Sequence, residues 1–189
     1  AQIGETTTDE IMNNVCDPLI LTSYEKSSEL IPGIAESWAI SEDGKQWTFK
    51  IRKGLKHSPS GNPLTAKDAE WSLRRVVQLN LNSANIITKW GINKDNVEQA
   101  IQAKDNDTLV VTFDKGYPQA LIGPVVFASR ASFVLDSVEA MKHDRIVGGP
   151  AAEPVATGAG GVGAQPLVGL VAVDLVLHRL DRVEHEAGA

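Results

Sequence analysis

Residues 43–44, an Asp-Gly pair, carry the strongest local structural signal in this chain. Asp-Gly supplies the residues of a tight turn, and here it joins two stretches in which apolar and polar side chains alternate. After the turn, Trp47, Phe49 and Ile51 alternate with polar residues, so one face of the strand is buried and the other faces water. The sequence therefore predicts a β-hairpin over residues 37–52, with an apolar face that anchors the core.

A capped helix and a second hairpin are predicted to pack with the first hairpin. Thr65 begins the run Thr-Ala-Lys-Asp, a variant of the capping box in which the Thr65 side chain caps the N–H of Asp68. The Asp68 carboxylate also places negative charge at the positive end of the helix. The helix is expected over residues 66–79, and residues 97–103 and 108–114 form the second hairpin candidate.

Four shorter elements are expected from local start and stop signals. Residues 9–16 are predicted to form one or two helical turns, and residues 19–24 a short strand. Residues 118–122 are expected to form a helix that begins at a proline and that the Gly-Pro pair at 123–124 stops. A last helix is predicted over residues 137–143. Together these elements indicate an α+β fold of antiparallel hairpins with covering helices.

Two side chains of this region fall outside the predicted core. The loop over residues 53–64, with its prolines and glycines, is expected to lie on the surface and to leave His57 in solvent. Trp71 projects from the helix nearly opposite the apolar face, beside Arg74 and Arg75. We expect Trp71 to pack under the proline-rich loop or against a neighbouring segment.

Charge and motif content exclude several functional classes. The net charge is -6 and no run of five like charges is present, so binding to nucleic acid or to anionic lipid is not expected. Cys16 is the single cysteine, and no Cys or His pair has metal-site spacing, so the sequence predicts no disulfide, metal or cofactor. The G-x-S-x-G, Walker and H-E-x-x-H motifs are absent, so an enzyme is not expected.

The composition of the chain changes near His143. All ten aromatic residues lie before Val134, whereas 24 of the 45 residues over 145–189 are Ala, Gly or Val. GC-rich DNA read in the wrong frame gives such a mixture, so a frameshifted tail over residues 145–189 is the favoured interpretation. The alternative is a genuine Gly/Ala linker that leads to a short amphipathic element.

A glycine-rich motif in the tail raises a further alternative. Gly158, Gly160 and Gly163 match the dinucleotide-binding spacing G-x-G-x-x-G, and Asp181 follows at a distance suited to binding a ribose hydroxyl. The motif functions only where a buried strand delivers it to a helix N-terminus, and the two prolines shortly before it make a poor strand. A nucleotide-binding protein is therefore a remote alternative.

Four runs of residues in the first part of the chain form a specific pattern. They are LIPGIAESW at 30–38, WTFKIRKG at 47–54, GNPLTAKD at 61–68 and WSL at 71–73. This pattern resembles the family 5 extracellular solute-binding proteins, which include the dipeptide, oligopeptide and nickel receptors. The resemblance covers residues 8–143.

The resemblance implies a fragment of a periplasmic-binding-protein-like (type II) fold. Residues 1–144 then form the edge of the first lobe and a small inserted domain, and residues 145–189 form a separate tail. The implied function is the solute-binding component of an ABC transporter: a periplasmic monomer that binds a small solute, such as a peptide, and delivers it to membrane permease subunits. Because the second lobe is missing, we expect an incomplete fragment that does not bind solute as the family does.

The resemblance also points to candidate ligand-binding residues. In the family, residues shortly before the Asp-Pro-Leu found here at 17–19 approach the binding cleft, so the candidates are Thr8 and Asp9. Capping of the first helix is their alternative role. The alternative function is a non-transport interaction module built on the same small domain. No basic segment followed by an apolar stretch opens the chain, so a secretory signal peptide is either removed or absent.

Overall fold

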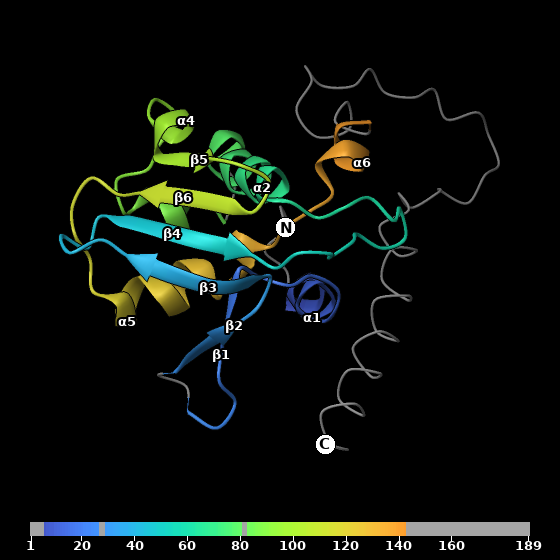
Figure 1. Cartoon of the computed structure of the whole chain (residues 1–189), viewed down its shortest axis with the longest axis horizontal. Helices are drawn as coiled ribbons and strands as arrows, with labels where there is room; N and C mark the ends of the chain where they lie inside the picture. Colours follow the sequence, from blue (N-terminus) through green and yellow to red (C-terminus); the bar gives the residue numbers. More distant parts are fainter. Residues whose placement is uncertain (1–5, 27–28, 81–82, 143–189) are drawn as a thin grey trace.

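The computed structural model describes residues 6–26, 29–80 and 83–142. These residues form an α+β domain with one four-stranded and one two-stranded antiparallel sheet, surrounded by short helices (Figure 1). None of the helices in this part of the chain is long and apolar enough to cross a bilayer. The elements in chain order are α1 (Thr6–Val15), β1 (Ile20–Thr22), β2 (Leu30–Pro32), β3 (Ala35–Ile40), β4 (Gln46–Ile51), α2 (Ala66–Leu79), α3 (Asn85–Thr88), α4 (Val97–Ala100), β5 (Ile101–Ala103), β6 (Thr108–Thr112), α5 (Gln119–Ile122), η1 (Gly123–Phe127), η2 (Arg130–Ser132) and α6 (Ser137–Lys142).

The four-stranded sheet is built on the predicted hairpin. Its strand order is β3-β4-β6-β5, and neighbouring strands are antiparallel. Gly44 occupies the β3–β4 turn with a φ of 69°, a conformation that glycine adopts without steric conflict. Trp38 lies opposite Phe49, and Ile40 opposite Trp47. The four side chains therefore share one face of the sheet, which confirms the first hairpin.

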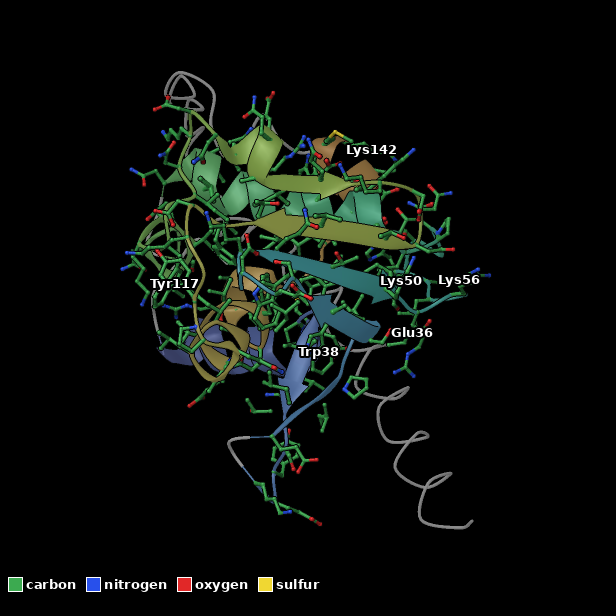
Figure 2. All side chains as sticks on the ribbon, turned by 60° about the vertical axis from the view of Figure 1, so that its left-hand side comes forward. Glu36, Trp38, Lys50, Lys56, Tyr117 and Lys142 are labelled. Atoms are coloured by element: carbon green, nitrogen blue, oxygen red, sulfur yellow. The ribbon has the colours of Figure 1, made fainter. Side chains whose placement is uncertain are left out.

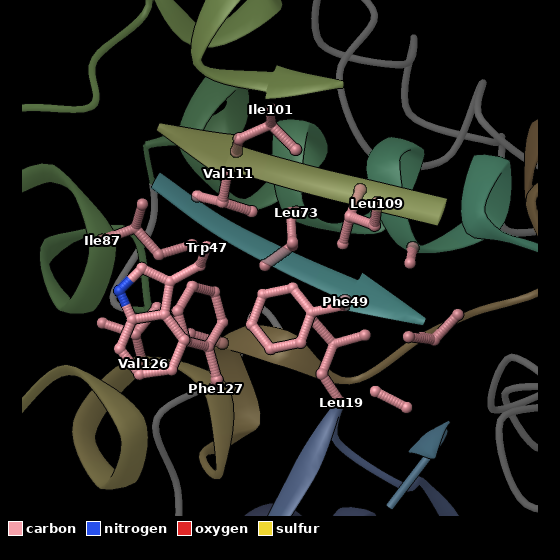
Figure 3. Close-up of a cluster of buried hydrophobic side chains, with 14 of the residues drawn as sticks. Leu19, Trp47, Phe49, Leu73, Ile87, Ile101, Leu109, Val111, Val126 and Phe127 are labelled. Carbon is pink, nitrogen blue, oxygen red and sulfur yellow. The ribbon is translucent and has the colours of Figure 1, made fainter. Parts of the chain in front are cut away.

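This shared face is the centre of the hydrophobic core (Figure 3). Trp47 and Phe49 are fully buried, and the ring of Phe127 packs 5.0 Å from the first and 4.6 Å from the second, between centroids. Leu109 and Val111 of β6 lie opposite Phe49 and Trp47 and extend the same apolar face. Such aromatic pairs stabilise by about 0.5–1.5 kcal/mol beyond the area that they bury. The predicted stripe on β4 therefore anchors the domain.

The other side chains of β4 are more exposed to solvent, as the alternation predicts. Gln46 and Lys50 are exposed, and Lys50 extends from the face opposite the core (Figure 2). The Lys50 ammonium donates a hydrogen bond of 2.7 Å to the Thr108 hydroxyl on β6. The period-two pattern thus separates a dry face from a polar one.

Helix α2 packs on the core face of the sheet, beside β5 and β6. Its bounds agree with the predicted helix, and Thr65 and Asp68 form the predicted capping box. Asn80 ends the helix in the left-handed region with a φ of 51°, which asparagine tolerates better than most residues. Its buried apolar residues are Ala66, Ala69, Leu73 and Val77.

The second hairpin is shorter than predicted. Residues Val97–Ala100 form helix α4, whereas the sequence predicted a strand from residue 97, and β5 comprises Ile101–Ala103 alone. Val97 and Ala100 are both buried. A helical turn places residues three apart on the same side, whereas a strand directs them to opposite faces. The prediction was therefore wrong for residues 97–100, because burial of this pair favours the helix.

The α-helix ends at Ile122, as predicted, but Gly123-Pro124 does not end the helical path of the chain. Helix α5 continues directly into the π-helix η1, with Pro124 at its start. Proline is tolerated in the first turn of a helix because an N–H there needs no helical partner. The continuation carries Val126 and Phe127 into the core, where both are buried. Apolar burial thus outweighs the local stop signal.

The two-stranded sheet contains one predicted and one unpredicted strand. The predicted strand, β1, pairs with β2, which the sequence did not indicate. Gly33 follows β2 where a Cβ would lie 2.8 Å from the carbonyl oxygen of Pro18. Only glycine allows this close approach of the backbones. The small sheet is therefore fixed against the domain next to the buried Leu19 and Ile20.

Candidate functional site

The candidate ligand-binding residues Thr8 and Asp9 lie within helix α1. The helix begins at Thr6, so neither residue stands before it as a cap, and the expected capping role is wrong. The side chains of Thr8 and Asp9 lie outside the part of the chain that the structure describes. Their proposed contact with a ligand stays a prediction.

A dense group of polar side chains lies where the loop over residues 53–64 meets α2 and α6. Sequence reasoning found only its Thr65–Asp68 pair, because the contacts of the loop residues are made with Asp68 and Asp136 only in the folded chain, and Asp136 and Ser137 lie far away in the sequence. We call this group the polar clasp. Its members are His57, Ser60, Asn62, Thr65, Asp68, Asp136 and Ser137.

Asp68 is the centre of the polar clasp and is only 6% exposed. Both the N–H and the hydroxyl of Thr65 donate to its Oδ2 at 2.9 Å. From the other side, the Ser137 hydroxyl donates to Oδ1 at 2.6 Å, and the Ser137 N–H at 3.3 Å. The His57 Nε2 lies 3.8 Å from Oδ2. One carboxylate therefore ties the first turn of α2 to the first residue of α6.

Asp136 makes a second connection of the same kind. The Ser60 hydroxyl and the Asn62 amide donate to its Oδ2 at 2.6 Å and 3.0 Å. Its Oδ1 accepts from the N–H groups of Val138 and Glu139 at 3.0 Å and 3.1 Å, as an N-cap does. Asp136 therefore starts α6 and fastens it to the loop.

Both carboxylates are held in their charged form. Burial acts to raise the pKa of Asp68, but His57 and the hydrogen bonds from Ser137 and Thr65 together hold it well below its ordinary value. Burial likewise opposes the ionisation of Asp136, whereas its hydrogen bonds from Ser60, the Glu139 N–H and Asn62 lower its pKa. The hydrogen bonds of the clasp are therefore charge-assisted.

The polar clasp combines Ser, His and Asp side chains but lacks the geometry of a nucleophilic site. A serine nucleophile needs its hydroxyl directed at a base that accepts the proton. Here the Ser137 hydroxyl donates to Asp68, and Asp68 separates it from His57. Within the described residues, no three His, Cys, Asp or Glu side chains are grouped to hold a metal ion. The arrangement joins segments of the fold.

The clasp corrects the expectation that His57 is solvated. Its side chain is only 9% exposed, beside Asp68. The loop that carries His57 is on the surface, as predicted, at Pro59 and Ser60. The ring nonetheless turns inward, because the loop folds over the start of α2. No local pattern around His57 signals this contact.

The structure also shows the surroundings of Trp71 and Cys16. The Trp71 ring is partly buried and packs with Arg75 one turn later on the same helix, 5.1 Å from guanidinium carbon to ring centroid, in a cation–π contact. Cys16 is partly buried, and burial raises the pKa of its thiol to about 11. The thiol is therefore unreactive at neutral pH.

Comparison with known proteins assigns the family. The sequence model of the bacterial extracellular solute-binding proteins, family 5 (middle region), matches residues 29–159. The chain is 32% identical over 114 residues to the dipeptide-binding protein DppE of Bacillus subtilis. This match covers 54% of this chain and 20% of that protein. It is 41% identical over 63 residues to the nickel-binding periplasmic protein of Escherichia coli, covering 33% of this chain and 12% of that protein.

Solved structures show the same fold. The Haemophilus influenzae protein OppA in complex with RPPGFSPFR matches with a TM-score of 0.64 and 25% identity, over 78% of this chain and 30% of that chain. The substrate-binding domain of an oligopeptide ABC transporter from Bacillus anthracis matches with a TM-score of 0.62 and 27% identity, over 76% and 28%. The domain therefore has the fold found in part of a type II periplasmic binding protein.

This chain belongs to the family 5 extracellular solute-binding proteins, which are binding proteins and not enzymes. It spans at most 30% of the length of the relatives described above. The family match runs to residue 159, past the predicted start of the tail at residue 145. Residues 143–189, with the glycine-rich motif at 158–163 and Asp181, lie outside the described residues, so the predictions for the tail stay predictions.

Proposed function

We propose that this chain is a portion of a peptide-binding receptor that delivers its solute to an ABC permease outside the cytoplasm. Two observations together support the proposal. The chain has the β3–β4 hairpin and the capped helix α2. Its relatives in the family include a dipeptide-binding and an oligopeptide-binding protein. In this proposal residues 1–144 form the edge of a first lobe and a small domain, and residues 145–189 form a separate tail.

In this proposal the solute is bound between two lobes of the complete receptor. Receptors that close about a hinge contact their solute from both sides, and this chain supplies a part of one side. The chain on its own is therefore not expected to bind peptides measurably. Thr8 and Asp9 are the residues we propose to contribute from this side.

The first experiment is to read the genomic DNA beyond the codon for Asp144 in all three frames. If one frame continues with a second lobe, the joined reading frame is expressed and purified. Titration calorimetry with di-, tri- and tetrapeptides is then expected to give micromolar binding to the joined protein and none to the 189-residue chain.

Three results oppose the proposal in different ways. A joined protein that binds no peptide but binds Ni²⁺ would change the solute. A genome with no continuation in any frame, together with a stable monomer of the present chain, would favour the interaction module. Thr8→Ala and Asp9→Asn variants of the joined protein that bind peptide with unchanged affinity would remove these two residues from the site.

A further inference from the structure

Helix α6 is attached to the domain mainly by polar contacts. It lies at the edge of the domain next to α2, and Lys142 marks its outer end (Figures 1 and 2). The helix contains no buried residue. Val138 and Met141, its larger apolar side chains, are 50% and 53% exposed. Apolar burial therefore contributes little to holding α6 in place.

Polar contacts supply most of the attachment instead, and they converge on two carboxylates. Asp68 receives the hydroxyl and N–H of Ser137, and Asp136 receives Ser60 and Asn62 from the loop. A neighbouring bond, 2.9 Å from the Leu135 N–H to the Ser72 hydroxyl, lies just before the helix. Except for this last bond, the hydrogen bonds at the joint are strongest when Asp68 and Asp136 are ionised.

The rest of the domain is stabilised differently. Trp47, Phe49 and Phe127 form a closed aromatic core that does not include α6. Release of α6 would expose neither this core nor the sheet. Elements with few buried apolar contacts open locally at lower free energy than the core of the same protein.

We propose that α6 is a latch, a helix that docks through the carboxylates of Asp68 and Asp136 and releases as a unit while the sheet and α2 stay folded. Release alters the joint between this domain and the chain beyond Lys142 without unfolding the domain. The inference concerns residues 136–142, which are Asp136 and helix α6, and does not depend on the proposed function.

Charge sets the condition for release. The pKa values of Asp68 and Asp136 lie below their ordinary values, so docking favours the ionised carboxylates. Both carboxylates are charged at neutral pH, and docking weakens as pH falls below the ordinary aspartate value of 3.8. The other charged groups that face the clasp are His57, which is cationic when protonated, and the Glu139–Lys142 pair on α6 itself.

Hydrogen exchange of single amides, measured by NMR on the full chain, tests the latch. In the wild type, the protection factors of residues 138–141 are expected to fall at least tenfold more than those of β4 and β6 between pH 6 and pH 3. At pH 6, Asp136→Ala is expected to lower protection in α6 at least tenfold and in the two strands less than threefold. Asp105→Ala, in the exposed turn between β5 and β6, is the matched control and leaves α6 unchanged.

Two results would overturn the proposal. One is equal loss of protection in α6 and in the strands on acidification, because α6 then belongs to the same cooperative unit as the core. The other is unchanged protection of residues 138–141 in Asp136→Ala. The wild-type measurement requires no variant to fold, so the proposal is tested even if Asp136→Ala is unstable.

Discussion

Replacement of Asp68 by Asn isolates the contribution of a single buried charge to this domain. The substitution keeps the size of the side chain but removes the charge and turns one acceptor oxygen into a donor. The new NH₂ group then faces either Thr65 or Ser137. Each of these residues presents a backbone N–H, which can only donate, and a hydroxyl, which must rotate before it can accept. Two hydrogen bonds are therefore lost or reversed whichever way the amide turns.

The size of the effect follows from these contacts. Hydrogen bonds to a charged group contribute about 1.5–3 kcal/mol each, and the retained pair loses its charge assistance. Relaxation of the exposed loop offsets part of this loss, so Asp68→Asn is expected to lower the free energy of unfolding by about 3 kcal/mol. In a domain of this size that corresponds to a decrease in Tm of roughly 10 °C.

Urea denaturation followed by tryptophan fluorescence measures the change, with Asp105→Asn in an exposed turn as the matched control. The pH dependence gives an independent check. Because the pKa of Asp68 is lower in the folded state, its stabilising contribution is complete above about pH 4 and is lost as pH falls further. The difference between wild type and Asp68→Asn must therefore shrink between pH 4 and pH 2. A difference below 0.5 kcal/mol at pH 7, or one that grows on acidification, would refute the reasoning.

Three further predictions test other parts of the structure. Phe49→Ala removes a fully buried ring from the aromatic core and is expected to lower the free energy of unfolding by about 3–5 kcal/mol in urea denaturation; a loss below 1 kcal/mol contradicts the assigned packing. Gly116→Ala would set a Cβ against the carbonyl oxygen of Asp43, so a decrease of roughly 2–4 kcal/mol is expected by the same measurement. An unchanged midpoint argues against that contact. Burial raises the pKa of the Cys16 thiol to about 11, so at pH 8 it is expected to react with iodoacetamide about 100-fold more slowly in the folded chain than in urea. Mass spectrometry measures the two rates, and equal rates would mean that the thiol is not buried.

The sequence determined those elements whose causes lie within a few residues of one another. The Asp-Gly turn and the alternation of Trp47 and Phe49 specify the first hairpin and its inward face, and both were predicted correctly. Thr65 and Asp68 stand three residues apart and start α2 where the capping box indicates. Family membership also followed from residues in these same segments, because they form the anchoring part of the fold.

Tertiary structure decided which local preferences were overruled and which polar groups met. The segment 97–100 is helical, and η1 continues past Gly123-Pro124, because burial in a shared core outweighs weak local signals. The polar clasp joins Ser60 to Asp136 across 76 positions and Asp68 to Ser137 across 69. No local pattern encodes such pairs: a carboxylate finds its donors only after the sheet and α2 have brought distant segments together, and only then does desolvation make these contacts strong.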